Sequence, residues 1–503
     1  MGSSLDSLIR EFPRADTLPQ SRPYTNHAVT LKQVASVEQR MQELERVRLN
    51  VFSYRAGLIT GTDYLSDSGT TTMTNKQWAS LHLGDESYGS NEGYFYLKDQ
   101  IRKLFGEQFF NEDQNLHPNA YIFHQGRAGE HALFTTLRRS IGPGKLVIPS
   151  NGHFDTTEAN IESNEIEPLN LFSPELKKAG SAYHFKGDMN VTALQELFES
   201  RSSEIPLVYL TITNNTGGGQ PVSMANIREV AKVAHDHGTP LFFDACRFAE
   251  NAWFIQKHEL GYSTKSIEEI VKEMFSYVDG FTTSFKKDGL VNMGGGVFLK
   301  EGGLFVKNYP NVPEVLRDHQ ILTEGHNTYG GLCGRDLMAL VEGLKTIVSS
   351  EYLKSRTEQV GAFGEAMHAR GIPVLTPVGG HAVYLDMVKF FEGTSMKRED
   401  FGGIAFTALL LGLYGDRACE LGDFAFGKYD RTTGKYTLPE NSNVRLAVPR
   451  LRYEETDLMA TVAAVEALYK NRGLIPGVNV EVGDLVKTLK HFKAGFAFKP
   501  LDN

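Results

Sequence analysis

The chain has 503 residues, of which 41% are hydrophobic and 22% are charged, and its formal net charge is −9. This is the composition of an ordinary globular protein, and the length fits about three domains, or two domains that share a large core. Because no basic tract accompanies the negative charge, nucleic acid and anionic membrane surfaces are poor candidate partners, and a small anionic ligand would need a local basic site.

The cysteines and the apolar runs indicate in which cellular compartment the protein is found. Cys246, Cys333 and Cys419 have no paired spacing, which argues against a disulfide framework and against a structural zinc site. The longest apolar run, at about 402–415, is too short to cross a bilayer, and no basic segment with an apolar core begins the chain. We therefore expect a cytoplasmic protein without a membrane partner.

The first 30 residues or so are rich in Pro, Ser, Arg and Asp and lack hydrophobic periodicity. This pattern predicts a flexible or partner-dependent arm. Ser36 and Gln39 then form a capping pair, and the apolar residues that follow recur at helical spacing. The sequence predicts a helix there that serves packing.

Between about residues 98 and 290, apolar β-branched runs alternate with amphipathic stretches. The runs at 145–149, 207–212 and 241–244 predict buried strands, and 225–237 predicts the helix between the last two. Such alternation is typical of a mostly parallel sheet with helices on both faces, in which ligands bind beyond the carboxyl ends of the strands. The residues just after each strand are therefore the candidates for a functional site.

Polar residues follow three of these apolar runs. Asp244 ends one strand and precedes Arg247, and a carboxylate there either caps the next helix or keeps a pyridine nitrogen protonated. Asn215 and three glycines follow another strand, as a bare turn or as backbone that approaches a ring closely. The segment 124–127 precedes a helix predicted from about Ala128, so it is either an ordinary turn or a phosphate cradle.

The segment from Ser284 to Asp288 joins an apolar run to three glycines, Gly294 to Gly296. Its two adjacent lysines, Lys286 and Lys287, are compatible with a solvated turn. A lysine amine with a lowered pKa, however, condenses with a carbonyl, as in a Schiff base to pyridoxal phosphate. The candidate carboxylate and the candidate phosphate cradle upstream are partners that this cofactor needs.

Beyond about residue 340 the elements become shorter, which predicts a smaller α/β domain. Arg445 lies in one of its strands, where a buried guanidinium is costly unless it meets a carboxylate, in a structural ion pair or on a ligand. The predicted elements are a strand-like run at 373–375, a strand within 379–386, a helix at about 401–413, a strand at 444–448 and a helix at 455–469.

Nine segments in one order carry a family resemblance. They are "LSDSGT" from Leu65, "GDESYGS" from Gly84, "HQGR" from His124, "GGQPVSMAN" from Gly218, "DACRFAENAWFI" from Asp244, "SFKKDGLVNMGGG" from Ser284, "YGGLCGRD" from Tyr329, "GGHAVYLD" from Gly379 and "VRLAVPR" from Val444. From about residue 64 to 492, the chain resembles the β-eliminating lyases of the tryptophanase and tyrosine phenol-lyase family, which are fold type I pyridoxal-phosphate enzymes.

The resemblance implies the domain organisation and the assembly. The expected parts are an N-terminal arm and helix at 1–64 that joins the small domain, a large cofactor-binding domain at 65–340 built like aspartate aminotransferase, and a small domain at 341–503. The family is usually a homotetramer, a dimer of dimers whose active sites are shared between subunits, and it binds potassium or ammonium. The N-terminal arm is longer here than is usual, which bears on the oligomer contacts.

The resemblance also assigns cofactor roles. Lys287 would form the Schiff base with pyridoxal phosphate and then act as the base on the substrate Cα proton. Asp244 would pair with the pyridine nitrogen, Arg247 would lie near the ring oxygen, and Phe154 would stack on the ring. The phosphate would be held by Gln125, Gly126, Arg127, Ser284 and Lys286.

Substrate and ion ligands follow from the same resemblance. Arg445, with Asn215 and Ser66, would bind the substrate carboxylate, and Asn215 would also contact the cofactor. Tyr88 would assist proton transfer to the leaving group in a neighbouring subunit's site, where Tyr329 would also contribute. The residues that would bind the monovalent cation are Gly69, Glu86 and Asn292.

Three positions separate the two branches of the family. Tyrosine phenol-lyases carry Thr after the stacking Phe, an Arg beside the phenol oxygen and a paired Phe near the C-terminus, whereas tryptophanases carry Asp, Ile and His. This chain has Asp155, Leu421 and His491, the last followed by Phe492. A carboxylate near an indole nitrogen stabilises the cation formed when indole C3 is protonated. The resemblance therefore favours elimination of indole from L-tryptophan, giving pyruvate and ammonia, with Asp155 and His491 as catalytic residues.

Two departures keep other substrates open. Ser66 stands where Thr is usual, Leu421 is not Ile, and segments such as "VNMGG" look closer to the tyrosine phenol-lyases. A tyrosine phenol-lyase, or a β-lyase or β-synthase for another β-substituted amino acid, is the alternative. A cofactor-binding protein without lyase activity is disfavoured because Lys287 is present.

Overall fold

The computed structural model describes residues 22–26, 28–32, 34–178, 181–430, 432–483 and 489–500. Most of the predicted arm lies outside these residues. Contacts divide the chain into two units, Met1–Lys32 and Gln33–Asn503. Every helix and strand of the described residues belongs to the second unit.

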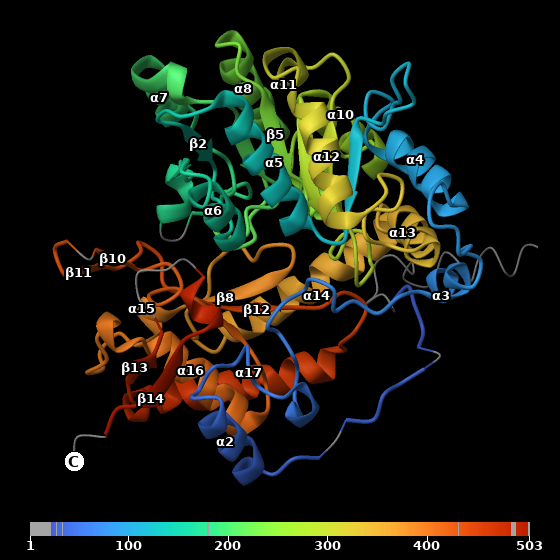
Figure 1. Ribbon diagram of the computed structural model, residues 1–503. Coiled ribbons are helices and arrows are strands. Elements are labelled where there is room, and N and C mark those ends of the chain that lie inside the picture. Colours follow the sequence, from blue (N-terminus) through green and yellow to red (C-terminus); the bar gives the residue numbers. More distant parts are fainter. Residues whose placement is uncertain are drawn as a thin grey trace, which may run out of the picture. The chain divides into compact units, whose positions relative to one another are not determined.

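A seven-stranded sheet, here called the large sheet, organises the first part of this unit (Figure 1). Its strands are β1 (Ala120–Phe123), β2 (Val147–Ser150), β3 (Glu167–Asn170), β4 (Val208–Thr211), β5 (Leu241–Asp244), β6 (Gly280–Ser284) and β7 (Gly295–Leu299). The order is β1-β7-β6-β5-β4-β2-β3. The neighbouring pairs β3–β2, β2–β4, β4–β5 and β5–β6 are parallel. Strand β7 runs antiparallel to both of its neighbours, β1 and β6. The predicted mostly parallel sheet is confirmed.

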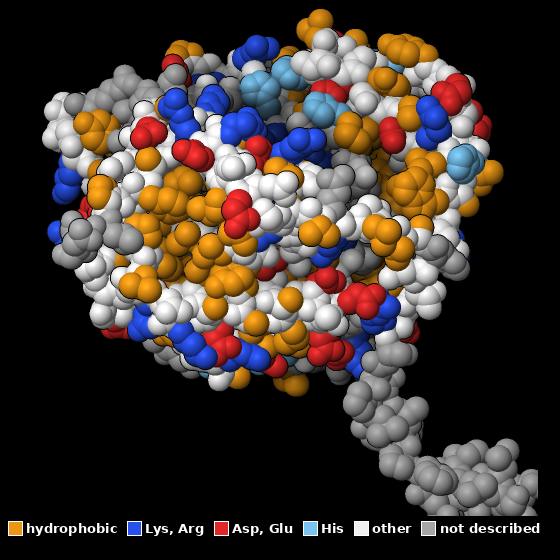
Figure 2. All heavy atoms as spheres, turned by 90° about the horizontal axis from the view of Figure 1, so that it is seen from below, with side chains coloured by type: hydrophobic (Ala, Val, Ile, Leu, Met, Phe, Trp, Pro, Cys, Tyr) orange, Lys and Arg blue, Asp and Glu red, His pale blue; other side chains and the backbone are white. Residues whose placement is uncertain are grey.

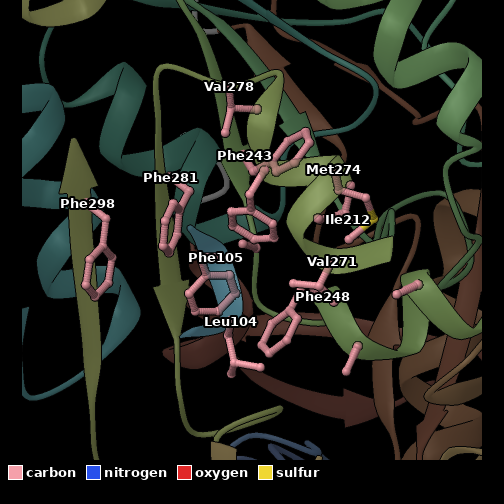
Figure 3. Close-up of a cluster of buried hydrophobic side chains, with 14 of the residues drawn as sticks. Leu104, Phe105, Ile212, Phe243, Phe248, Val271, Met274, Val278, Phe281 and Phe298 are labelled. Carbon is pink, nitrogen blue, oxygen red and sulfur yellow. The ribbon is translucent and has the colours of Figure 1, made fainter. Parts of the chain in front are cut away.

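Helices cover both faces of the large sheet because its strands are apolar on both sides. On β5, Phe243 packs into one hydrophobic cluster, whereas its neighbour Phe242 packs into another on the opposite face. Figure 3 shows the first cluster, in which Phe243, Phe281 and Phe105 lie together. The helices of this part are α3 (Asn75–Leu81), α4 (Glu92–Phe105), α5 (Gly126–Ile141), α6 (Asp155–Glu162), α7 (Val191–Arg201), α8 (Met224–Asp236), α9 (Phe248–His258), α10 (Ile267–Ser276), α11 (Leu304–Asn308), α12 (Val312–Glu324) and α13 (Gly334–Thr346).

The second part is built on a three-stranded antiparallel sheet, here called the small sheet, in the order β8-β12-β9. Its strands are β8 (Ala382–Asp386), β9 (Cys419–Leu421) and β12 (Asn443–Ala447), and two further pairs are β10 (Lys428–Asp430) with β11 (Lys435–Thr437) and β13 (Val478–Val482) with β14 (Gly495–Phe498). The helices are α14 (Ser350–His368), α15 (Met387–Phe390), α16 (Gly402–Leu409) and α17 (Glu455–Lys470). Short 3₁₀ turns lie at Ala56–Leu58, Pro174–Lys177, Ser202–Glu204, Arg398–Asp400, Arg472–Leu474 and Lys490–Phe492.

The helix predicted after Ser36 is α2 (Val37–Arg46). Ser36 Oγ accepts from the backbone N–H of Gln39, and Gln39 Oε1 accepts from that of Ser36, so the predicted capping pair is present. Leu44 of α2 belongs to the hydrophobic cluster around the small sheet, and Arg40 donates to the carbonyl of Gly412 at 3.0 Å. The helix therefore packs against the second part of the chain.

Two predicted elements differ from the structure in type and not only in their bounds. The run at 373–375 is not a strand, since only Val374 makes a single bridge, to Leu385. Pro373 has no N–H for a ladder, which explains why pairing does not extend. The helix predicted at 401–413 is α16 followed by a π-helical turn at Leu410–Tyr414.

Charged side chains of both signs are interspersed on the face shown in Figure 2, with hydrophobic side chains gathered between them. Among the helices that the structure describes, none is both long and apolar enough to cross a bilayer.

Candidate active site

A cavity of about 220 Å³ lies between the large and small sheets. Asp244 and Ser284, the last residues of β5 and β6, line it from the large sheet, and Leu421 and Arg445 line it from β9 and β12. The predicted residues that it gathers are Ser66, Gln125, Gly126, Arg127, Phe154, Asp155, Asn215, Asp244, Arg247, Ser284, Lys286, Lys287, Leu421, Arg445, His491 and Phe492. Their individual roles remain predictions.

The start of α5 lies against the end of β6. A Cβ added to Gly126 would stand 2.6 Å from the Cβ of Ser284, so only glycine lets the helix begin this close to the strand. No side chain caps α5 at Gln125, and Arg127 and Lys286 bring positive charge to the same end of the cavity. Burial and the neighbouring charge of Lys287 lower the pKa of Lys286. This end of the cavity suits a phosphate group.

Two buried carboxylates, Asp244 and Glu130, lie close together in the same cavity. Burial, together with the charge of Asp244, raises the pKa of Glu130 to about 8, and Thr157 Oγ1 donates to Glu130 Oε1 at 2.7 Å. Glu130 therefore holds its proton at neutral pH. Glu130 was not predicted, although its position one turn after Gly126 on α5 places it on the same helix face.

Arg445 reaches the cavity from β12. Its Nη1 donates to Asn215 Oδ1 at 3.3 Å and its Nη2 to the carbonyl of Leu65 at 3.0 Å, while its buried Nε has no hydrogen-bond partner in the described ranges. Tyr384 donates its O–H to Asn215 Oδ1 at 2.5 Å and holds that amide in place. None of the ion pairs found between described residues involves Arg445, so its guanidinium is available for a ligand carboxylate.

Arg247 is engaged in a way that was not predicted. Its Nη2 and Nε donate to the two carboxylate oxygens of Asp67 at 2.7 and 3.0 Å. Burial opposes ionisation of Asp67, but the charges of Arg247 and other neighbours hold the pKa of its carboxyl well below the usual range. Arg247 still lines the cavity, as a fixed positive charge whose orientation Asp67 sets.

Asp155, Leu421 and His491 line this cavity and also a neighbouring one of about 440 Å³. His491 Nε2 lies 3.1 Å from Asp155 Oδ2, and both side chains are buried. Neither ring nitrogen of His491 makes an aligned hydrogen bond within the described part of the chain. The ring of Phe52, which was not predicted, lies 5.5 Å from that of His491. An apolar wall with one carboxylate and one imidazole suits an aromatic group that carries an N–H.

Tyr88 and Tyr329 do not line this cavity. Tyr88 is 68% exposed, and its ring centroid lies 5.6 Å from that of Tyr329 and 6.1 Å from that of His326. The structure therefore brings these two predicted residues to each other, at a surface outside the cavity.

The three residues predicted to bind a cation are only partly brought together. A Cβ on Gly69 would lie 3.2 Å from the carbonyl oxygen of Asn292, so these two residues adjoin. Glu86 is exposed and pairs with Arg335 at 3.4 Å. Within the described ranges, no group of three or more His, Cys, Asp or Glu side chains is arranged to hold a metal ion.

The sequence has relatives among known proteins. The family model described as beta-eliminating lyase matches residues 63–464. The chain belongs to the β-eliminating lyase family. Its relatives include a probable tryptophanase from Aeropyrum pernix, 37% identical over 95% of this chain and 97% of that protein. A tryptophanase from Rhodobacter capsulatus is 40% identical over 86% and 89%, and a tyrosine phenol-lyase from Symbiobacterium thermophilum is 35% identical over 95% and 98%.

Solved structures share the fold of this lyase. A threonine aldolase from Leishmania major superposes with a TM-score of 0.53 at 14% identity, covering 81% of this chain and 99% of that one. A serine palmitoyltransferase from Sphingomonas wittichii superposes with a TM-score of 0.51 at 13% identity, covering 83% and 88%. At these identities the likeness concerns the fold alone, and it confirms the predicted fold type I architecture.

Proposed function

We propose that this lyase catalyses the pyridoxal-phosphate-dependent β-elimination of L-tryptophan to indole, pyruvate and ammonia, as a carbon–carbon lyase. The observation that carries the proposal is the buried pair of Asp155 and His491, which faces the cavity without satisfying the histidine nitrogens. An indole N–H is the kind of group that this pair would bind. Relatives named tryptophanase and tyrosine phenol-lyase support the reaction class.

The residues present fit pyridoxal phosphate. Gly126 at the start of α5 and Ser284 line the cavity and would hold the phosphate, and Asp244 would pair with the pyridinium nitrogen. Lys287 would hold the cofactor covalently and Phe154 would stack on its ring. When bound, the cofactor withdraws electrons from the substrate and so acidifies its Cα proton.

Arg445, Asn215 and Lys287 would then define the geometry at Cα. The guanidinium of Arg445, which lines the cavity and makes no ion pair between described residues, would bind the substrate carboxylate, beside the amide of Asn215 and the hydroxyl of Ser66. A carboxylate held there fixes which Cα bond points at Lys287. Lys287 Nζ takes the Cα proton as a general base.

The leaving group sets the second requirement. An aryl carbanion does not leave, so indole C3 must gain a proton before the bond from Cβ to C3 breaks, and the positive charge then spreads to the indole nitrogen. The carboxylate of Asp155 stabilises that charge, and His491 keeps the carboxylate oriented. Tyr88 of a neighbouring copy would deliver the proton, with Tyr329 beside it.

Several finer points belong to the same proposal. The enzyme would be a cytoplasmic homotetramer, a dimer of dimers, in which Tyr88 crosses to a neighbouring site. Gly69, Glu86 and Asn292 would bind potassium or ammonium, with Glu86 released from Arg335. Hard oxygen ligands suit such an ion, and activity in potassium compared with activity in lithium tests this point.

Pyruvate release from a panel of amino acids tests the proposal. With pyridoxal phosphate and potassium present, L-tryptophan should give equimolar indole and pyruvate, and L-tyrosine should give little phenol. S-Aryl-L-cysteines should also react, because a thiolate leaves without ring protonation. Pyruvate from S-aryl-L-cysteine without indole from L-tryptophan would overturn the substrate assignment and leave the lyase chemistry standing.

A second candidate is elimination from, or synthesis of, another β-substituted amino acid, including tyrosine. A neighbouring cavity of about 440 Å³ shares Asp155, Leu421 and His491 with the first one, so the aryl side has room beyond a bare indole. A substituted tryptophan that outcompetes L-tryptophan in the same panel would favour this candidate. Phenol release from L-tyrosine would favour the tyrosine phenol-lyase branch.

A further inference from the structure

Six charged side chains are buried together next to the cavity. They are Asp67, Arg247, Glu250, Asp288, Arg356 and Arg450, each no more than 3% exposed. Three carboxylates face three guanidinium groups, so the charges balance when all six are ionised. Buried charge is costly unless it is paired with good geometry, and removal of one partner leaves the others uncompensated.

Arg450 links the three carboxylates of this cluster. Its Nη1 lies 2.9 Å from Asp67 Oδ2, and its Nη2 lies 2.8 Å from Glu250 Oε1 and 2.9 Å from Asp288 Oδ1. These carboxylates come from three separate segments, one before α3, one in α9 and one after β6. The planar guanidinium fixes their relative positions in a way that a single ammonium does not.

Each segment bound by Arg450 carries a residue of the active site. Asp288 directly follows Lys287, and its Oδ2 also accepts the backbone N–H of Ala249 at 2.8 Å. Asp67 directly follows Ser66 and holds Arg247 through both oxygens. Arg450 itself lies five residues beyond Arg445, on the segment that leaves β12.

We propose that Arg450 is a positioning residue that fixes the segment of Lys287 relative to that of Arg445, through its ion pairs with Asp288, Asp67 and Glu250. This inference rests on the roles proposed for Lys287 and Arg445. Without the guanidinium, Asp288 loses the ion pair that anchors the segment of Lys287, and the segment after Arg445 loses its ion pairs with Asp67, Glu250 and Asp288. Both reacting groups are then free to shift relative to each other.

Arg356 provides a matched control. It is equally buried and donates from Nε to the same Glu250 Oε1 at 3.2 Å. Among the ion pairs found between described residues, its only partner is Glu250, whereas Arg450 also reaches Asp67 and Asp288. Arg356→Met therefore removes a buried charge from the cluster and leaves the links to Lys287 and Arg445 in place.

The test compares Arg450→Met, Arg450→Lys, Asp288→Asn and Arg356→Met, each as the full chain loaded with pyridoxal phosphate. Thermal midpoints report the structural loss. Borohydride reduction followed by peptide mass analysis reports the fraction of chains whose cofactor is fixed to Lys287, and kcat and KM are measured with L-tryptophan and an S-aryl-L-cysteine.

A displacement of about 1 Å costs roughly 100-fold in rate, so Arg450→Met should lower kcat by about that factor with both substrates. Its KM should rise about tenfold, since the guanidinium of Arg445 moves as well. Asp288→Asn should lower kcat and leave KM unchanged, because it acts on the lysine segment alone. Arg450→Lys should recover more of the thermal midpoint than of kcat, and Arg356→Met should match the thermal loss while keeping kcat, KM and fixation to Lys287.

Equal kcat and KM values, and an equal fraction of chains with the cofactor fixed to Lys287, in Arg450→Met and Arg356→Met would overturn the proposal. Arg450 would then have a structural role only. If Arg450→Met does not fold, Asp288→Asn decides by itself, and unchanged fixation with unchanged kcat counts against the proposal. A wild-type enzyme that releases pyruvate from no amino acid would overturn the proposed function instead. The borohydride comparison still tests the positioning of Lys287 in that case.

Discussion

Asp155 and Leu421 carry the proposed choice of leaving group. Asp155 would stabilise charge on the indole nitrogen, and Leu421 would fill the place where an Arg would serve a phenol oxygen. Both side chains are buried in the wall of the cavity, so a change there acts on the aryl group without touching Lys287 or Arg445.

We expect the double substitution Asp155→Thr with Leu421→Arg to lower indole release from L-tryptophan by about 100-fold, the usual effect of removing one electrostatic stabiliser of a transition state. Elimination from an S-aryl-L-cysteine should fall much less, because no ring carbon needs a proton. Leu421→Ile, which conserves volume, serves as the control and should stay within about threefold of wild type on both substrates. Equal losses on the two substrates would mean that these residues do not select the aryl group.

Glu130 predicts a pH dependence of stability. Its pKa is raised from the ordinary value of 4.5 to about 8 in the folded chain, so the folded state holds more protons than the unfolded state between these two values. Stability contributed by this group is therefore lost as the pH rises from about 4.5 to 8. Glu130→Gln removes the titration and keeps the size of the side chain.

Denaturant unfolding of the cofactor-free protein at pH 5.5, 6.5 and 7.5 would measure this effect. The free energy of unfolding of wild type should fall more steeply than that of Glu130→Gln, by about 1.4 kcal/mol per pH unit for one proton. Parallel curves would show that Glu130 does not hold a proton in the folded enzyme.

At the level of elements, the start of α5 and the end of β6 form the proposed phosphate site. Gly126→Ala places a methyl group 2.6 Å from the Cβ of Ser284, so the helix must move away from the strand. We expect pyridoxal phosphate to bind at least about tenfold more weakly, since several hydrogen bonds at the helix start are lost together. The dissociation constant measured by fluorescence titration checks this expectation.

Gly361→Ala is the matched control for this substitution. Gly361 lies inside α14, and an added Cβ there would meet nothing within 4 Å. Alanine in a helix interior is favoured over glycine by up to about 1 kcal/mol, so this variant should be as stable as wild type or more so and should bind the cofactor normally. Cofactor binding that weakens equally in both variants would contradict the proposed role of the α5 start.

Sequence patterns predicted whole elements well where periodicity and capping agreed. β5 was predicted with its observed bounds, α17 differs by one residue at its end, and the capping pair of α2 is present. The prediction failed at 373–375 because a short apolar run does not reveal that Pro373 cannot pair. It also began α5 two residues late, because a helix start defined by Gly126 has no capping side chain to mark it.

At the level of the whole molecule, the two parts of the chain meet at the cavity. Two hydrophobic clusters cover the two faces of the large sheet, and two others lie around the small sheet. On this basis we propose the domain bounds 65–340 and 341–503, with α2 from the segment 1–64 joining the small domain. The site lies between these domains, as ligand sites in two-domain α/β enzymes do.

The contacts between the two domains explain why only some residues of the site could be predicted from the sequence. Residues that follow strands, such as Asp244 and Lys287, were predictable because parallel strands end at one edge. The ion pair between Asp67 and Arg450 was not, since it joins residues 383 positions apart. Both lie in segments that carry the family resemblance, but the sequence does not show that these two side chains meet. Glu130 was missed for a related reason, because its role depends on burial beside Asp244.

Tyr88 tests the proposed sharing of sites between subunits. Its side chain is 68% exposed and lies outside the cavity of its own chain, so we expect Tyr88→Phe to be nearly inactive on L-tryptophan by itself. Mixing it with Lys287→Ala after partial denaturation and reassembly should restore about a quarter of wild-type activity, since half of the dimers in a symmetric exchange are mixed and each has one complete site. No recovery in reassembled mixtures would place Tyr88 outside the neighbouring site.

Lys287 is proposed to hold the cofactor and to take the Cα proton of L-tryptophan. The most direct measurement compares wild type with Lys287→Ala, both incubated with pyridoxal phosphate and dialysed, for the visible absorbance of a lysine-bound cofactor and for indole and pyruvate release. Wild type should keep the absorbance band and release equimolar indole and pyruvate, and the variant should show neither. Indole release by Lys287→Ala at a rate close to wild type would contradict the account.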